Sequence, residues 1–331
     1  MLKIGVLGAG HLGRIHIGLL KDIEEYDLIG FYDKDRSKAA KVEHEFGITA
    51  FDSEEALMDK VEVMDIVTPT SLHYECALRA LNAGRHFFVE KPLTNTVDEA
   101  EVLVKLLEQT SLKGMVGHVE RFNPAFQAAQ KVGLEPLFIE GHRLAEFKPR
   151  GIDVSVILDL MIHDIDLILS LIPYEVVKVN ASGVAVVSDH VDIANARIEF
   201  ENGAVANLTC SRISLKTERK LRLFQRNAYI TIDLHKKELN IFKLKDLGHD
   251  QDTSSLFVLD LGEDKGRKEV IFESPALPDN NAIQTELKEF ALCILRNTPP
   301  PVTLRDGLRS MRLAQLILEQ ITLNVNKIDS L

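Results

Sequence analysis

Short apolar runs alternate with amphipathic stretches over the first 120 residues of the chain. Buried parallel strands are continuous apolar runs, whereas amphipathic helices repeat their apolar positions every three to four residues. The runs that predict strands are Lys3–Leu7, Leu28–Tyr32, Met64–Val67, His86–Val89 and Lys113–Val116. The stretches that predict helices are about Leu12–Leu20, Arg36–Phe46, Ser53–Asp59, Leu72–Ala83 and Val97–Gln109. This alternation predicts an α/β domain with a parallel sheet and crossover helices.

The pattern changes after Pro136, where apolar and polar residues alternate in successive runs joined by short turns. These runs are Glu175–Val187, Asp192–Glu199, Ala204–Ser211, Arg219–Phe224, Tyr229–Leu234 and Glu238–Leu244. Alternation with a period of two predicts an antiparallel sheet. Asn202-Gly203 predicts a two-residue type I′ hairpin, because that turn needs positive φ at both positions. The stretch Leu247–Lys268 is expected to be a polar loop.

Three helices are expected in the second part of the chain, at about Leu158–Leu171, Ala282–Arg296 and Leu304–Ile321. The prolines at 299–301 separate the last two, since proline breaks a helix interior. We expect a nucleotide-binding domain over residues 1–120 and an α+β domain for substrate binding and oligomerisation over 121–331. The C-terminal helix is expected to pack back on the first domain.

Composition and charge argue against several classes of protein. A chain of 331 residues with 45% hydrophobic residues can bury a large core, which excludes a disordered chain. The net charge of −11 argues against a general binder of nucleic acid or of anionic membranes and favours a small-molecule partner. Cys76, Cys210 and Cys293 lie far apart, so neither a disulfide framework nor a zinc site is indicated. With no signal peptide or membrane span expected, the protein is predicted to be cytoplasmic.

A glycine-rich turn, Gly8-x-Gly10-x-x-Gly13, follows the first predicted strand and encloses His11 and Leu12. Gly8 allows the sharp turn, Gly10 lets the backbone approach a pyrophosphate, and Gly13 lets helix and strand pack closely. Asp33 ends the second strand twenty residues later, where a carboxylate binds the adenosine ribose hydroxyls. The pattern predicts NAD as cofactor. NADP is the less favoured alternative, which Lys34 and Arg36 leave open.

Two further groups of residues suggest chemistry. Asp159, His163 and Asp166 are spaced to share one face of a helix, and histidine suits the removal of a hydroxyl proton. Glu90-Lys91-Pro92 follows the fourth strand, where Lys91 would polarise the reacting oxygen. Alternatively, the helical residues are a buried polar pair and the second group is a strand-end turn. Spacing alone leaves these alternatives open.

Taken together, the motifs resemble the Gfo/Idh/MocA family of oxidoreductases. The residues that carry the resemblance are the glycine turn, Thr68-Pro69-Thr70 with His73, Glu90-Lys91-Pro92, and Asp159 with His163 and Asp166. The resemblance implies a Rossmann domain followed by a domain with a large open, mainly antiparallel sheet that often serves for oligomerisation, here as a dimer or tetramer. It implies Lys91 and His163 as the catalytic pair with Asp159 in support. It also implies a nicotinamide site lined by Thr68, Pro69, Thr70, His73 and Glu90.

A narrower resemblance comes from residues 117–124 and 150–154, which are similar to the branch that oxidises UDP-N-acetylglucosamine at its 3-hydroxyl. The expected substrate contacts are His118, Arg121, Asn123, Lys148, Arg150 and Asp166. Arginine forks match phosphate oxygens, although Lys148 and Arg150 could equally belong to a solvated loop.

The sequence thus predicts an NAD-dependent dehydrogenase of a secondary sugar hydroxyl, with a nucleotide sugar favoured as substrate and no metal. Three alternatives remain. The first is a dehydrogenase of a free sugar or inositol, and the second is a glycosidase that uses tightly held NAD. The third is a nucleotide sensor without chemistry, which is disfavoured because a sensor has no need for Lys91, Asp159 and His163 together.

Overall fold

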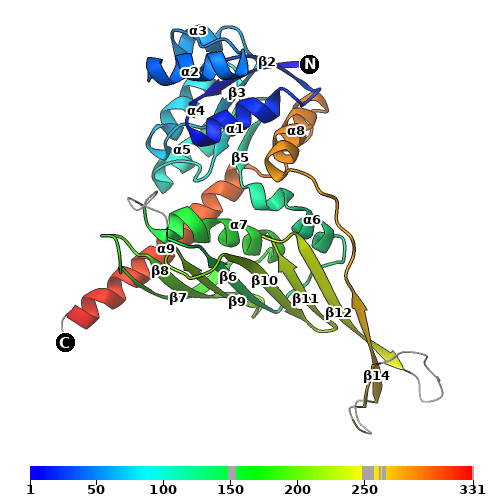
Figure 1. The fold of residues 1–331 in the computed structure, drawn as a ribbon. Coiled ribbons are helices and arrows are strands. Elements are labelled where there is room, and N and C mark those ends of the chain that lie inside the picture. The colour runs from blue at the N-terminus through cyan, green and yellow to red at the C-terminus, as the bar shows by residue number, and fades with distance from the viewer. Residues whose placement is uncertain (148–153, 248–256, 261, 263–265, 330–331) are drawn as a thin grey trace. The chain divides into compact units, whose positions relative to one another are not determined.

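The computed structural model describes residues 1–147, 154–247, 257–260, 262 and 266–329 (Figure 1). The chain divides into two compact units. Unit 1 comprises Met1–Phe122 and Asn280–Leu313, and unit 2 comprises Asn123–Asp279 and Ala314–Leu331. A long helix, α9 (Leu304–Asp329), therefore begins in unit 1 and ends in unit 2.

Unit 1 contains the predicted parallel sheet. Its strands are β1 (Leu2–Leu7), β2 (Tyr26–Tyr32), β3 (Val63–Ile66), β4 (His86–Glu90) and β5 (Gly114–Gly117). They are ordered β2-β1-β3-β4-β5, and each neighbouring pair is parallel. All residues of β3 and β5 are buried, as expected for strands covered on both faces. The prediction of a parallel α/β fold is confirmed.

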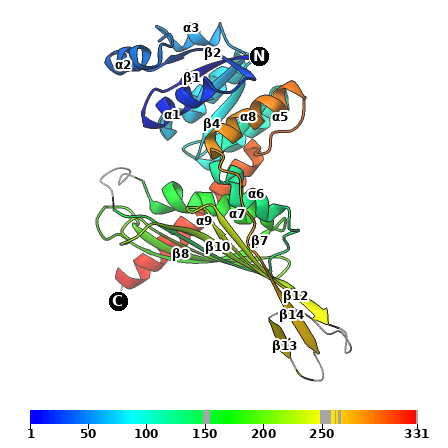
Figure 2. The ribbon, with the colours of Figure 1, turned by 45° about the vertical axis from the view of Figure 1, so that its right-hand side comes forward.

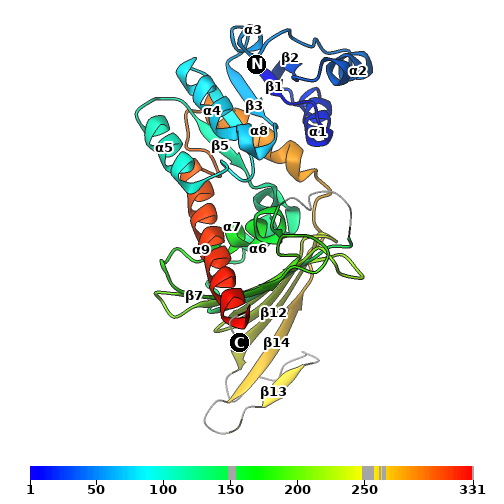
Figure 3. The ribbon, with the colours of Figure 1, turned by 90° about the vertical axis from the view of Figure 1, so that its left-hand side faces the viewer.

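Helices cover both faces of this sheet. They are α1 (His11–Leu20), α2 (Arg36–Phe46), α3 (Glu54–Met58), α4 (His73–Asn82), α5 (Val97–Glu108) and α8 (Ala282–Leu295), with short 3₁₀ turns η1 (Thr70–Leu72) and η2 (Val119–Phe122). α1 and α8 pack together on one face, and α4 and α5 pack together on the other (Figure 3). Local sequence fixes several ends: Thr96 and Glu99 form a capping box at α5, and Gly47 ends α2 with φ +65°.

Unit 2 contains the second sheet, which in the described part of the chain has nine strands. They are β6 (Phe138–Leu144), β7 (Val176–Val184), β8 (Ile193–Phe200), β9 (Val205–Ser211), β10 (Glu218–Gln225), β11 (Ala228–Asp233), β12 (Glu238–Leu247), β13 (Val258–Asp260) and β14 (Arg267–Glu273). The order is β13-β14-β12-β11-β10-β6-β9-β8-β7, antiparallel except between β6 and β9. The far end of β12, with β13 and β14, extends beyond the other strands (Figure 2). The mainly antiparallel sheet is thereby confirmed.

Three helical segments precede β7 in unit 2: α6 (Pro124–Gln130), a π-helical turn η3 (Ile157–Met161) and α7 (Ile162–Leu171). α6 and α7 lie on one face of the sheet (Figure 1). A buried ion pair fixes α7, because the Arg143 guanidinium on β6 donates to both Asp164 carboxylate oxygens at 2.9 and 2.8 Å. Among the described residues, every helix is too short or too polar to cross a membrane.

Two local predictions are wrong. At Asn202-Gly203 only Gly203 has positive φ, at +81°, and its N–H donates to the Phe200 carbonyl at 2.9 Å. The hairpin thus turns through residues 201–203 instead of through a type I′ pair, and the Asn202 side chain accepts from the Ala204 N–H at 3.0 Å. The expected polar loop at Leu247–Lys268 contains β13 and the start of β14. β13 has only three residues at the edge of the sheet, and β14 beside it begins with the charged residues Arg267, Lys268 and Glu269, so neither strand has the apolar pattern of a buried strand.

Candidate active site

The glycine turn between β1 and α1 is shaped by three different constraints. Gly8 has φ +98°, which L side chains rarely adopt. A Cβ at Gly13 would lie 2.0 Å from the Gly8 carbonyl oxygen, so the helix packs directly on the turn. A Cβ at Gly10 would meet nothing within 4 Å, so the space in front of the α1 N-terminus is open. These are the three roles that the dinucleotide motif requires, and the turn therefore fits a pyrophosphate.

Asp33 lies beside this turn and is buried. Its carboxylate accepts from the Ala9 N–H at 2.8 Å and from the Asp35 N–H at 2.9 Å. The Lys38 ammonium lies 3.3 Å from the same carboxylate. Arg36, expected as a group that offsets Asp33, instead donates to the Phe51 carbonyl and pairs with Asp52. The basic residue in contact with Asp33 is thus Lys38, which the sequence analysis did not single out.

The loops after β3 and β4 are joined by His73. This imidazole is buried, with one ring nitrogen 2.8 Å from the Pro92 carbonyl oxygen and the other 2.9 Å from the Thr68 carbonyl oxygen. Burial lowers the pKa of His73, and a neutral ring donates to only one of the two carbonyls. The carboxyl ends of the neighbouring strands β3 and β4 are followed by Thr68-Pro69-Thr70 and by Lys91, respectively. Open α/β sheets bind ligands at this end of their strands.

Glu90 ends β4 and is buried, whereas Lys91 is half-buried. The Glu90 carboxylate accepts from the Lys91 N–H at 3.3 Å. A Cβ at Gly117 would lie 2.9 Å from Glu90 Oε1, so a glycine on β5 makes room for this side chain. Glu90-Lys91-Pro92 is therefore a packed strand end, and Lys91 lies at the carboxyl end of the parallel sheet.

The proposed catalytic helix of unit 2 begins with the π-helical turn η3, which contains Asp159, and continues as α7, which contains His163 and Asp166. The spacing predicts one regular helix over these three residues, whereas the structure has a π turn at Asp159 before the α-helix. Asp159 and His163 are half-buried, whereas Asp166 is buried at 1% exposure. π turns are frequent at functional sites.

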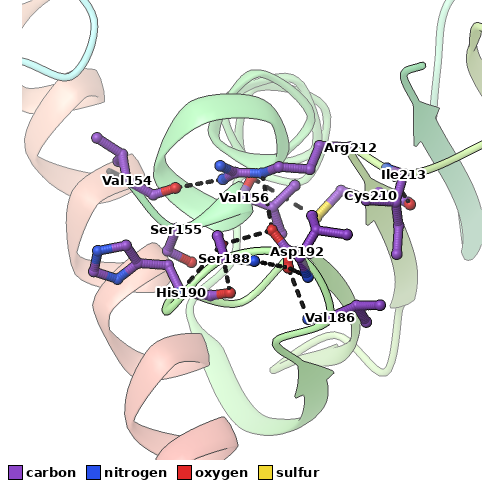
Figure 4. A network of polar contacts seen from close by, with 12 residues as sticks. Val154, Ser155, Val156, Val186, Ser188, His190, Asp192, Cys210, Arg212 and Ile213 are labelled. Atoms are coloured by element: carbon purple, nitrogen blue, oxygen red, sulfur yellow. Dashed lines mark hydrogen bonds and ion pairs between the residues drawn. The ribbon is translucent and has the colours of Figure 1, made fainter. Parts of the chain in front are cut away.

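A polar network in unit 2 holds the beginning of this helix (Figure 4). Asp192 Oδ2 accepts from the N–H groups of Val186, Val187 and Ser188 at 2.7, 2.7 and 3.1 Å. The Arg212 guanidinium lies 3.7 Å from Asp192 and also donates to the Val154 carbonyl. The Val156 N–H donates to the Val191 carbonyl at 3.0 Å. The loop before β8 thus anchors the residues that precede Asp159.

The expected substrate contacts have varied environments. His118 is buried, and Arg121 is 14% exposed with its guanidinium 4.0 Å from Asp306. Asn123 caps α6 through the Ala125 N–H at 3.1 Å, and its amide donates to the Leu234 carbonyl at 2.9 Å. These bonds give Asn123 a structural role at the start of α6. Lys148 and Arg150 lie outside the described residues.

Sequence reasoning missed a buried ionisable cluster in unit 1, formed by His16, Asp65, Glu90 and Glu286. Asp65 gives a sequence signal, since it is a charged residue inside the otherwise apolar run of β3. His16 and Glu286 occupy the buried faces of α1 and α8, and only the fold brings these helices together. Neither this cluster nor any other group of His, Cys, Asp and Glu among the described residues is arranged to hold a metal ion.

Comparison with known proteins extends over both units. A profile of the GFO/IDH/MocA oxidoreductase family with NAD-binding Rossmann fold matches residues 2–118, and a profile of the GFO/IDH/MocA C-terminal domain matches residues 114–231. The UDP-N-acetylglucosamine 3-dehydrogenase of Acidithiobacillus ferrooxidans is 41% identical over 242 residues, which are 73% of this chain and 77% of that protein. The scyllo-inositol 2-dehydrogenase (NAD(+)) of Bacillus subtilis is 29% identical over 233 residues, which are 64% and 68% of the two chains.

A solved structure of the UDP-N-acetylglucosamine 3-dehydrogenase from Acidithiobacillus ferrooxidans superposes with a TM-score of 0.86 and 34% identity over 97% of both chains. The residues of the glycine turn and Asp33 fit NAD, and the family profile names the same cofactor. With 41% identity over 73% of its length to a named dehydrogenase and both family profiles matched, the chain belongs to the GFO/IDH/MocA family of NAD-binding oxidoreductases.

Proposed function

We propose that the protein is an NAD-dependent dehydrogenase that oxidises the 3-hydroxyl of UDP-N-acetylglucosamine or of a related nucleotide sugar. The observation that carries this proposal is the likeness to the solved UDP-N-acetylglucosamine 3-dehydrogenase, which extends over 97% of both chains at 34% identity. A likeness of that extent includes unit 2 and not the Rossmann domain alone. The inositol dehydrogenase matches only 64% of the chain, at 29% identity.

In this proposal His163 accepts the proton of the reacting hydroxyl, since imidazole exchanges protons near neutral pH. Asp159 orients the His163 ring, and the Lys91 ammonium stabilises the negative charge that develops on the oxygen. NAD, when bound, supplies the acceptor for the hydride that leaves the carbinol carbon. The N–H groups at the start of α1 hold the pyrophosphate, and Asp33 binds the adenosine ribose.

Among the expected substrate contacts, Arg121 is proposed to meet the diphosphate, because its planar guanidinium matches phosphate oxygens. His118 and Asp166 are proposed to contact the same substrate. Asn123 is not proposed as a substrate contact, because its side chain caps α6.

The activity is tested by mixing the purified protein with NAD and UDP-N-acetylglucosamine. NADH formation is followed by absorbance, and the ketone is identified by a mass lower by two hydrogens. Turnover of the nucleotide sugar and not of myo-inositol is the expected result. NADH formation with inositol or a free sugar alone would contradict the proposed substrate, and sugar cleavage without net NADH would point to a glycosidase.

His163→Asn keeps the size and polarity of the side chain but removes the proton acceptor. We expect kcat to fall by about 10²–10⁴-fold, the usual contribution of a general base, while NAD affinity changes by less than about twofold. Titration calorimetry with NAD provides the second measurement. Normal turnover by this variant would remove His163 from the mechanism.

We also propose that the protein is a homo-oligomer that associates through the sheet of unit 2. A row of ring contacts crosses five adjacent strands, from β6 through β10, β11 and β12 to β14. The rings are Phe138, Phe224, Tyr229, Phe242 and Phe272. Phe272 is 56% exposed, whereas the alternate residues of these strands, such as Leu223 and Ile230, are fully buried. A continuous, partly exposed aromatic row on a sheet face favours protein association.

A further inference from the structure

Four ionisable side chains from four elements meet in the interior of unit 1. They are His16 on α1, Asp65 on β3, Glu90 at the end of β4 and Glu286 on α8. His16, Asp65 and Glu286 have no exposed surface, and Glu90 is 8% exposed. Burying charge is costly unless the charges are paired, so the protonation states of these groups must balance.

The His16 imidazole bridges two carboxylates. Its Nδ1 lies 2.9 Å from Asp65 Oδ2, and its Nε2 lies 3.3 Å from Glu90 Oε1. A neutral imidazole has only one N–H, so both contacts are favourable only when both nitrogens carry a proton. Burial by itself lowers the pKa of His16. The negative charges of Asp65 and then Glu90 raise it by more, so the pKa lies well above 6.5. His16 is therefore an imidazolium at neutral pH.

Glu286 adds no charge to the cluster. Neither of its carboxyl oxygens has a hydrogen-bond partner among the described residues. Burial, together with the negative charges of Glu90, Asp65 and Glu120, raises the pKa of Glu286 well above its ordinary value. Burial and the charge of Asp65 also raise the pKa of Tyr26, which stays neutral. Among the described residues, His16 is a cationic group that contacts both Asp65 and Glu90.

Glu90 is confined from several sides. His16 contacts one carboxylate oxygen, and the Lys91 N–H donates to the other at 3.3 Å. The Gly117 backbone lies against the same side chain, and no Cβ would fit there. The orientation of Glu90 therefore depends on the imidazolium, whose own ring is fixed through Asp65.

We propose that His16 is a positioning residue that acts through Glu90: oriented by Asp65, it holds the Glu90 carboxylate in place at the strand end that carries Lys91. The inference rests on the proposed function, because Glu90 ends β4 at the carboxyl end of the parallel sheet, where the family resemblance implies the nicotinamide half of the cofactor site. An ionised carboxylate in that place favours the cationic nicotinamide of NAD⁺ over the neutral ring of NADH. His16 thus contributes to the choice between the two forms without touching the cofactor.

The test is a double-mutant cycle with His16→Gln, Glu90→Gln and the double variant, and Glu286→Gln is the matched control. Titration calorimetry measures the ratio of NADH to NAD⁺ dissociation constants between pH 6 and pH 8. We expect this ratio to fall by about tenfold in each single variant, the lower end of the coupling between two close charges, and no further in the double variant. Glu286→Gln should keep the wild-type ratio, because it replaces a neutral acid with a neutral amide.

Each alternative outcome has a distinct meaning. Additive effects, or an unchanged ratio in His16→Gln, overturn the positioning role even if the variant is less stable. Thermal melting identifies a variant that fails to fold, and His16→Asn then takes the place of His16→Gln in the cycle. A wild-type protein that binds the cofactor but oxidises no nucleotide sugar leaves this test intact and contradicts only the proposed substrate. A wild-type protein that binds neither form of the cofactor contradicts both proposals.

Discussion

Single residues in the glycine turn serve two separable purposes. Gly13 is required by packing, because its Cβ would lie 2.0 Å from a backbone oxygen that cannot move aside cheaply. Gly10 is not required by packing, because a Cβ there meets nothing within 4 Å and its φ of −68° suits any residue. The motif joins a glycine needed for the fold with one needed for the ligand.

Gly13→Ala and Gly10→Ala should therefore fail in different ways. Gly13→Ala is expected to destabilise the protein by about 3 kcal/mol, the upper range for overpacking against a fixed neighbour. Gly10→Ala is expected to melt within about 0.5 kcal/mol of wild type, as surface substitutions do, yet to bind NAD at least about tenfold more weakly. Urea unfolding measures the first effect and calorimetric NAD titration the second.

The pair of variants contains its own control. Loss of stability in Gly10→Ala, or normal stability in Gly13→Ala, would contradict this division of roles.

Among the elements, the loop between β7 and β8 determines how the proposed catalytic helix of unit 2 begins. Its three N–H groups converge on Asp192, and the same carboxylate faces Arg212, which holds the Val154 carbonyl. The burial of Asp192 by itself raises its pKa, but the hydrogen bonds from Val187, Val186 and Ser188 lower it to about 2. Three peptide N–H groups and a hydroxyl thus stabilise the ionised form.

Asp192→Asn should remove this contribution in a pH-dependent way. A carboxyl whose folded pKa is below its unfolded value of about 3.9 stabilises the fold above about pH 4, and its contribution is lost as the pH falls through about 2. We expect the variant to lose about 2 kcal/mol at pH 7 and the difference from wild type to narrow below pH 4. Denaturant unfolding at several pH values measures this difference in the free energy of unfolding.

Asp189→Asn is the matched control, because Asp189 is exposed on the same loop. Its stability should stay within about 0.5 kcal/mol of wild type at every pH. A stability difference for Asp192→Asn that does not depend on pH would assign the loss to packing and not to charge.

For the whole molecule, the aromatic row on the unit 2 sheet bears on assembly. Phe242 and Phe272 belong to neighbouring strands, and their ring centroids lie 4.8 Å apart. Both are partly exposed, at 37% and 56%. Rings held in a row across a rigid sheet lose little entropy on association, so they suit the centre of an interface.

Phe242→Lys and Phe272→Lys should each weaken self-association by about 30-fold or more, since aromatic anchors commonly contribute about 2 kcal/mol to an interface. Sedimentation equilibrium over a concentration series measures the shift toward monomer. Val102→Ser, a change of a 42% exposed residue on α5, is expected to leave the association constant unchanged. A monomeric wild type, or an unchanged constant in both lysine variants, would exclude this face as the interface.

Local pattern in the sequence was enough to predict the parallel sheet, the glycine turn with Asp33, the strand-end Lys91 and the mainly antiparallel second sheet. These features depend on periodicity, on glycine stereochemistry and on short spacings, all of which act over a few residues. The same reasoning did not predict local features that depend on contacts with other segments. The π turn at Asp159 and the cap made by Asn123 are examples.

Only the tertiary structure decided which polar groups became partners. His16 and Asp65 are 49 positions apart, and Glu286 enters the same interior on a helix from the far end of the chain. The protonation of a buried group depends on burial and on charges within a few ångströms, and neither is encoded in sequence spacing. The sequence by itself therefore determined the fold class and the kind of cofactor. Only the folded chain determined that Glu90, the residue before Lys91, is contacted by His16.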